Sequence, residues 1–307
     1  MNKKNIIALV ILSVLMIIFF ISKGRENIEK RSGVFNFKHA DVTRIQIIQP
    51  YSDSLEVAQE NKVWTILHPR YVSAKESQIQ RFFDEFLTLT VSNNAISDSP
   101  DRQAFYQVDE PAATRISVFG KKDKLLRTVY YGRSNQNPQI AYIRLKNDNN
   151  IYQINNIYHV INPNLSSWRD DRIITFTQSE ILKIQTSTYE LSHETGMWMV
   201  TNTTNGEVGL ITPMNNEFTR IMNAITGLRT TIFFDDVFGE HEENLSNPAL
   251  EMMITLNDGD LVYLRLAQND ANSYILQKND TTETLYRLTI AQFNSLNVNP
   301  VLLFEDM

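Results

Sequence analysis

The sequence contains one pattern twice, and this internal repeat constrains the fold more than any other feature. Trp64 lies in the short run Val-Trp-Thr-Ile, and Trp198 lies in the similar run Met-Trp-Met-Val. Four further pairs keep the same order along the chain: Phe86 with Ile225, Leu89 with Leu228, Tyr142 with Tyr274, and Tyr152 with Tyr286. Two tandem copies explain this series better than coincidence. Because two copies are too few for a solenoid, we predict two similar lobes.

Each copy combines strand-like and helix-like patterns. Short runs rich in β-branched and aromatic residues, separated by polar turns, predict strands. In the first copy these runs are residues 42–48, 54–57, 63–66, 113–119, 125–131, 140–145 and 151–154. In the second copy they are residues 181–185, 189–192, 197–200, 250–256, 261–266, 273–277 and 285–288. Between the third and fourth runs of each copy, apolar residues recur at helical spacing, over 79–87 and 218–228, and predict one helix.

We therefore predict an α+β fold, with an N-terminal transmembrane helix followed by two tandem repeats. Each repeat is expected to form a mainly antiparallel sheet with one helix packed on it. The predicted domains are an anchor and stalk over residues 1–31, a first repeat over 32–170 and a second over 171–307. Trp64 and Trp198 are predicted core residues beneath the helices, and ligand stacking is the alternative role for this pair.

Residues 6–21 form an uninterrupted apolar run of sixteen residues. As a helix this run reaches about 24 Å, short of the ~30 Å hydrocarbon core, but flanking lysines can close the gap by snorkelling. We predict an uncleaved anchor that contacts membrane lipid. A cleaved signal peptide is the alternative, although Ser22-Lys23-Gly24-Arg25 lacks the small residues of a usual cleavage site.

The orientation of the predicted anchor depends on two opposing signals. Basic residues lie on both sides of the apolar run, and their count slightly favours a cytoplasmic C-terminal flank. Long domains, however, translocate largely regardless of flank charge, and a short basic start before one apolar segment is typical of a signal anchor. We therefore expect a single-pass membrane protein with the bulk of the chain outside the cytoplasm.

Charge and cysteine content exclude several classes of function. The chain has a net charge of −6, and residues 1–31 hold six basic and two acidic side chains, a net +4, so the rest carries −10. An acidic body without a basic stripe argues against nucleic-acid binding. The sequence contains no cysteine, which excludes disulfides, thiolate catalysis and thiolate metal sites.

The segment between the two copies, residues 166–173, is the strongest candidate for a binding patch. It reads Ser-Ser-Trp-Arg-Asp-Asp-Arg-Ile, and tryptophan and arginine are enriched at binding hot spots. The candidate patch consists of Trp168, Arg169, Asp170 and Arg172. In the alternative, which we favour, Trp168 fills a seam between the lobes and the arginines pair with the neighbouring aspartates.

This segment, together with the duplicated strand-and-helix unit, resembles the bacterial family catalogued as domain of unknown function 4340. The resemblance covers most of residues 34–300. It implies attachment by one N-terminal helix, and some members are similar in genomic setting to accessory parts of ABC-type export or gliding-motility systems. It implies no catalytic residues.

Motifs for catalysis or metal binding do not emerge from the residues. The five histidines are scattered, and no His-Glu-x-x-His pair is present. Residues 239–243 (Gly-Glu-His-Glu-Glu) are a candidate metal site or a solvated loop, and we favour the loop. Residues 257–260 (Asn-Asp-Gly-Asp) predict a hairpin turn rather than a calcium loop. Nucleotide-binding and hydrolase motifs are absent from the sequence.

We therefore predict a membrane-anchored, extracytoplasmic protein that is not an enzyme and uses no cofactor or metal. Its expected role is that of an accessory or scaffold component of an envelope complex, with a membrane-protein partner. Two alternatives remain open: a sensor of a small ligand, and a hydrolase with a cleft between the lobes.

Overall fold

The computed structural model describes residue 16 and residues 31–51, 54–212 and 214–304. Apart from Met16, the apolar run that predicts the membrane anchor lies outside the described residues. Within the described ranges, no helix is long and apolar enough to cross a membrane. The chain divides into two compact units, Met1–Asp170 and Asp171–Met307.

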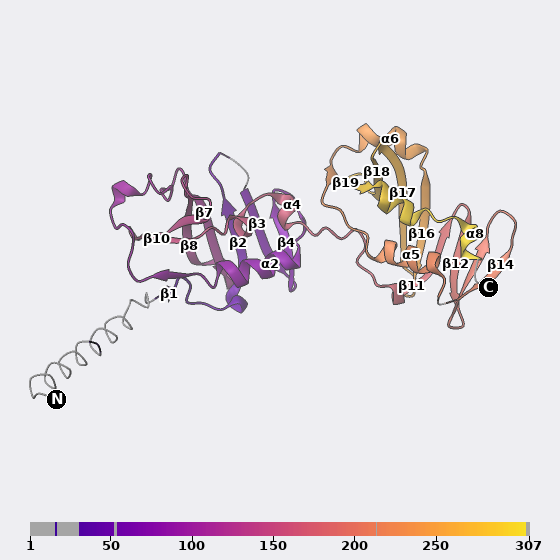
Figure 1. The fold of residues 1–307 in the computed structure, drawn as a ribbon, viewed down its shortest axis with the longest axis horizontal. Helices are drawn as coiled ribbons and strands as arrows, with labels where there is room; N and C mark the ends of the chain where they lie inside the picture. Colours follow the sequence, from indigo (N-terminus) through magenta and orange to yellow (C-terminus); the bar gives the residue numbers. More distant parts are fainter. Residues whose placement is uncertain (1–15, 17–30, 52–53, 213, 305–307) are drawn as a thin grey trace, which may run out of the picture. The chain divides into compact units, whose positions relative to one another are not determined.

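The described part of the first unit is built on an antiparallel sheet of eight strands in the order β10-β9-β8-β7-β2-β3-β4-β5 (Figure 1). The strands are β2 (Val42–Ile48), β3 (Ser54–Glu60), β4 (Val63–His68), β5 (Val72–Ser73), β7 (Thr114–Gly120), β8 (Lys124–Arg133), β9 (Ile140–Leu145) and β10 (Ile151–Asn155). A separate ribbon pairs β1 (Arg31–Gly33) with β6 (Thr90–Ser92). The helical segments are η1 (His39–Asp41), α2 (Glu76–Arg81), η2 (Phe82–Phe86), η3 (Pro100–Arg102), η4 (Lys121–Asp123), α3 (Tyr158–Ile161) and α4 (Leu165–Trp168).

The described part of the second unit is built on a nine-stranded sheet in the order β14-β13-β12-β11-β16-β17-β18-β19-β15. The strands are β11 (Ile181–Thr186), β12 (Tyr189–Glu194), β13 (Met197–Asn202), β14 (Val208–Ile211), β15 (Phe233–Asp235), β16 (Leu250–Leu256), β17 (Leu261–Asp270), β18 (Ser273–Lys278) and β19 (Thr284–Thr289). The helical segments are η5 (Gln178–Glu180), α5 (Asn216–Thr226), α6 (Phe238–Ser246), α7 (Ile290–Leu296) and α8 (Pro300–Leu303).

The two large sheets have the same strand order. In the first sheet β2 and β7 are central, with β3, β4 and β5 on one side and β8, β9 and β10 on the other. In the second sheet β11 and β16 are central, with β12 to β14 on one side and β17 to β19 on the other. The second sheet has one additional strand, β15, beyond β19. The two units therefore differ at this outer edge.

The predicted α+β class is wrong, because the described residues are mostly β-sheet, with 42% strand and 23% helix. The strands extend beyond the β-branched runs into polar residues, as β17 does up to Asp270, since ladder bonds use the backbone and not the side chain. The predicted helix over residues 79–87 is also interrupted. Its α-helical part ends at Arg81, and Phe82–Phe86 forms a π-helical turn.

Most of the predicted residue pairs occupy equivalent places, but one pair does not. Trp64 on β4 packs edge-on against Phe83 with ring centroids 5.7 Å apart, and Trp198 on β13 packs on Phe218 at 5.2 Å. Both tryptophans are only partly buried. The predicted pairing of Tyr142 with Tyr274 is wrong by one residue.

Tyr142 packs with Tyr130, Ile151 and Val108 in a small cluster separate from the main core of the first unit. Tyr274 instead packs on the main core of the second unit, where its ring stacks on Phe293 at 3.7 Å. A shift of one residue along a strand moves a side chain to the opposite face of the sheet. Tyr142 and Tyr274 are therefore the same residue type but do not occupy equivalent positions.

Candidate functional site

A groove of about 450 Å³ lies along the outer edge of the first sheet. We name it the first groove. Gln153, Ile154 and Asn155 of β10 line it on one side, and Thr90 and Ser92 of β6 line it on the other. β10, labelled in Figure 1, is the last strand of its sheet, so among the described strands of this sheet only β9 lies beside it.

The other edge of β10 is only partly covered. The N–H of Ile151 donates to the carbonyl of Ser97 at 2.8 Å, and the N–H of Ile96 donates to the carbonyl of Ile151 at 2.8 Å. Since alternate residues of a strand direct their backbone groups to the same edge, Gln153 and Asn155 direct theirs the same way as Ile151. Within the part of the chain that the structure describes, these outward groups of Gln153 and Asn155 have no hydrogen-bond partner.

Uncharged polar side chains dominate the first groove. Hydroxyl and amide groups come from Thr88, Thr90, Ser92, Asn94, Gln153 and Asn155. Among the described residues that line it, Glu85 is the charged one, and its Oε2 lies 3.0 Å from Nε2 of His159. The groove therefore offers hydrogen-bond donors and acceptors rather than a strong charge.

The second unit has a groove in the equivalent place, also of about 450 Å³, which we name the second groove. It lies between residues 229–232 and residues 287–289 of β19. Corresponding hydrogen bonds establish the equivalence: Val34 N–H donates to Leu89 O at 2.9 Å, and Ile173 N–H donates to Leu228 O at 3.0 Å. Because Tyr152 aligns with Tyr286, Gln153 of the first groove corresponds to Arg287 of the second.

The second unit covers the strand edge that the first unit leaves open. β15 pairs with β19, with Phe234 opposite Leu285. The N–H of Arg287 donates to Ile232 O at 3.1 Å, and the carbonyl of Arg287 accepts from the Thr230 hydroxyl at 2.7 Å. Residues just before β15 therefore satisfy the backbone groups of Arg287, whereas the corresponding groups of Gln153 have no partner among the described residues.

A difference in loop length explains this difference between the units. Phe234, which pairs with Leu285, comes six positions after Leu228. Ser97, which bridges to Ile151, comes eight positions after the equivalent Leu89. The two additional residues in the first unit form part of the loop before Ile96, and the chain does not follow β10 as far as Gln153.

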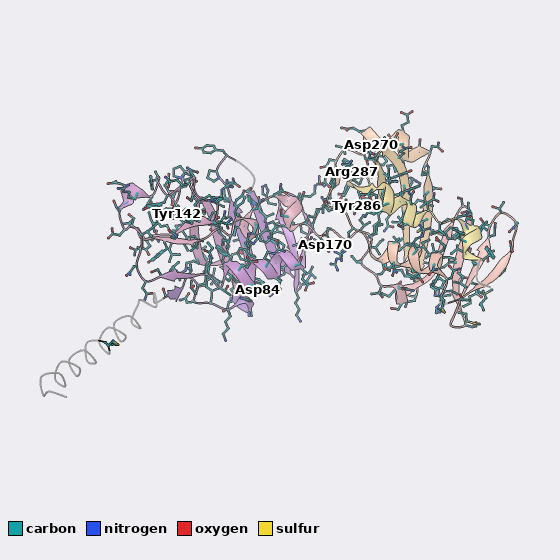
Figure 2. The ribbon with its side chains drawn as sticks, in the orientation of Figure 1. Asp84, Tyr142, Asp170, Asp270, Tyr286 and Arg287 are labelled. Atoms are coloured by element: carbon teal, nitrogen blue, oxygen red, sulfur yellow. The ribbon has the colours of Figure 1, made fainter. Side chains whose placement is uncertain are left out.

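Nearby carboxylates balance the positive charge of the arginines in the second groove. Arg229 Nη1 lies 2.7 Å from Asp171 Oδ1. Arg287 Nη2 lies 3.7 Å from Asp270 Oδ2, and both of these residues are labelled in Figure 2. The pKa of Asp270 is lowered, mainly because the Ser273 hydroxyl donates to its carboxylate. The carboxylate therefore remains charged beside Arg287 at neutral pH.

The structure separates the four residues of the predicted binding patch. Trp168 is 0% exposed in the core of the first unit, where its indole N–H donates to Asn162 O at 2.7 Å and its ring lies 5.9 Å from Phe82. Arg169 is 6% exposed and bridges to Ala74, and the Asp170 N–H donates to Ser73 O at 2.9 Å. These three residues belong to the first unit.

Arg172 is exposed and belongs to the second unit, where its backbone bridges to Arg229. A fully buried Trp168 presents no surface to a partner. The side chain belongs to the hydrophobic core of the first unit.

The acidic cluster at residues 239–243 lies in α6, not in the predicted loop. Over the described residues, no group of three or more His, Asp and Glu side chains is placed to hold a metal ion. Residues 257–260 connect β16 to β17 as a tight turn with Gly259 at φ 92°, which confirms the predicted hairpin turn.

The sequence model of a family described as Domain of unknown function (DUF4340) matches residues 64–248, more than half of the chain. The chain belongs to this family. The DUF4340 match begins in β4 of the first unit and ends just before β16 of the second, so it includes β6, β10 and β15. Neither the comparison with curated proteins nor the comparison with solved structures found a match.

Proposed function

We propose that this DUF4340 chain is a membrane-associated binding protein without enzymatic activity, an accessory or scaffold component of an envelope complex. The observation that supports this proposal best is the uncovered edge of β10 in the first groove. Natural proteins usually cover or blunt exposed sheet edges, because an uncovered edge pairs with other chains. An uncovered edge in a recessed polar groove is typical of a surface that receives a partner.

The proposed location is a membrane, with the body of the chain outside the cytoplasm. The apolar run over residues 6–21 supports membrane attachment, because its composition suits a lipid environment. The net charge of −10 on residues 32–307 supports a protein partner over nucleic acid. The resemblance to this family implies that some members are similar in genomic setting to accessory parts of ABC-type export or gliding-motility systems, and this agrees with the proposed role.

A small-ligand sensor is the second candidate. The first groove has the volume of a small-molecule site, about 450 Å³, and its walls carry hydroxyl and amide groups. A sensor would bind a polar, uncharged compound there. We favour the protein partner, because small-molecule sites are mostly apolar, whereas this groove exposes strand backbone.

Photo-crosslinking in native membranes tests the proposed function. A photoreactive amino acid replaces Asn155 in the first groove, and in a matched control it replaces Lys124, an exposed residue of β8 in the same unit. We expect one recurrent membrane protein to be crosslinked from position 155 and not from position 124. Recovery of the chain alone from both positions would contradict a binding function.

A further inference from the structure

We propose that the partner binds as an extended segment that adds to β10 as an antiparallel strand, hydrogen-bonded to the backbone of Gln153 and Asn155. This inference rests on the proposed function and states the kind of partner that the first groove takes. The partner is a polypeptide in β conformation, recognised through its backbone, and it completes the sheet of the first unit.

The second unit shows what fits such an edge. There β15 (Phe233–Asp235) runs along β19 in the antiparallel direction, and the residues just before it satisfy the backbone of Arg287: Ile232 O accepts from its N–H, and the Thr230 hydroxyl donates to its C=O. Gln153 occupies the equivalent position on the same scaffold, and its N–H and C=O point into the groove. An occupant of the first groove therefore supplies one carbonyl to accept from Gln153 and one donor for its carbonyl.

The length of the uncovered edge fixes the size of the occupant. Ser97 and Ile96 already cover Ile151, so the partner reaches Gln153 and Asn155 only. At ~3.4 Å per residue, a strand segment of about three to four residues spans this length. Thr90 and Ser92 of β6 form the opposite wall of the groove, so it has room for a single strand segment beside β10, whereas a second copy would bring its β9 as well. For this reason we assign the groove to a short segment of another protein.

The side chains of the groove indicate the chemistry of that segment. Thr88, Thr90, Ser92 and Asn94 face it with hydroxyl and amide groups, and the Glu85 carboxylate has His159 as its partner. Such walls satisfy small polar side chains and provide no counter-charge for a charged one. The segment that covers β19 contains two threonines, Thr230 and Thr231, beside Ile232, and the first groove fits a segment of this kind.

A peptide with the sequence of residues 230–232 (Thr-Thr-Ile), capped at both ends and labelled with a fluorophore, tests the inference on the detergent-solubilised full chain. We expect saturable binding by fluorescence anisotropy and slower amide hydrogen exchange at Gln153 and Asn155. The control is the same peptide with N-methyl groups on the amides of its first Thr and its Ile, which correspond to positions 230 and 232. It should bind at least about tenfold more weakly, because it cannot pair with a strand edge.

Two variants of the chain provide the matched comparison. Gln153→Pro removes the outward N–H but leaves the β9 ladder intact, because proline is tolerated at an edge position whose N–H faces away from the sheet. Gln153→Thr changes the side chain and keeps the N–H. We expect Gln153→Pro to weaken peptide binding at least about tenfold and Gln153→Thr to change it less than about threefold.

Three results would overturn the inference: no peptide binding to the wild-type chain, equal binding of the methylated peptide, or equal binding to Gln153→Pro. The methylated peptide gives a decisive answer even where Gln153→Pro does not fold. Self-association of the wild-type chain that Gln153→Pro abolishes would assign the groove to a second copy instead. A crosslinked partner that persists in Gln153→Pro would refute strand addition and leave the proposed function standing.

Discussion

Two buried tyrosines, Tyr131 and Tyr189, differ in the hydrogen bonding of their hydroxyl groups, and we expect their hydroxyls to affect stability in opposite directions. The Tyr131 hydroxyl donates to Asn156 Oδ1 at 2.6 Å, whereas the Tyr189 hydroxyl is buried without a hydrogen-bond partner among the described residues. A buried hydroxyl without a partner destabilises the folded state, and a paired one stabilises it. The two residues therefore respond differently to the loss of the same atom.

We predict that Tyr189→Phe leaves the free energy of unfolding unchanged or raises it by about 1 kcal/mol, and that Tyr131→Phe lowers it by about 1 kcal/mol. Urea denaturation at pH 8 measures both values. A loss of stability in Tyr189→Phe as large as that in Tyr131→Phe would contradict the prediction, since it would mean that the Tyr189 hydroxyl makes a favourable interaction.

The same tyrosines predict a loss of stability at high pH. Burial is the main cause that raises the pKa of both hydroxyls above the ordinary value of 10. The unfolded chain releases these protons near pH 10 while the folded chain retains them, so the unfolded state gains stability as pH rises. The stability difference between pH 8 and pH 11 should be smaller in Tyr189→Phe than in the wild-type chain.

At the level of secondary-structure elements, β10 and β19 differ in whether the outward backbone groups of the strand have hydrogen-bond partners. The N–H of Arg287 donates to Ile232, whereas the outward N–H of Gln153 has no partner in the described residues. We predict that Arg287→Pro lowers the free energy of unfolding by about 1–2 kcal/mol more than Arg287→Ala, because it removes this hydrogen bond. Gln153→Pro should lower it by less than about 1 kcal/mol relative to Gln153→Ala.

Thermal and urea unfolding of the four variants measure this difference. The alanine variants control for the loss of each side chain, including the ion pair of Arg287 with Asp270. An equal effect of proline at both positions would mean that the edge of β10 is covered in the folded chain, and it would remove the basis for strand addition.

The sequence predicted many individual strands but not the elements that define the site. The run at residues 42–48 coincides with β2, because alternating β-branched residues pack on one face of a sheet. No sequence pattern predicted β6 and β15, which have three residues each. Such short strands are set by pairing with neighbours that are distant in the sequence, and local patterns do not contain this information.

In the whole molecule, the duplication allows the open edge of β10 to be compared with the covered edge of β19. The sequence alone indicates two copies, and the equal strand order of the two sheets shows how far the copies correspond. The predicted patch at Trp168 followed residue types enriched at interfaces, but a buried core uses tryptophan as well, and composition does not separate the two roles. A signal for the groove was present in the different spacings after Leu89 and Leu228, which become informative only once the strand pairing is known.

The most direct measurement combines crosslinking with the edge variants in native membranes. The photoreactive residue stays at position 155, and position 153 carries Gln, Thr or Pro. We expect the wild-type chain and Gln153→Thr to crosslink the same partner. The yield of the crosslinked partner should fall at least about tenfold in Gln153→Pro. Equal yields from all three chains would contradict the proposal that the partner binds to the open edge of β10.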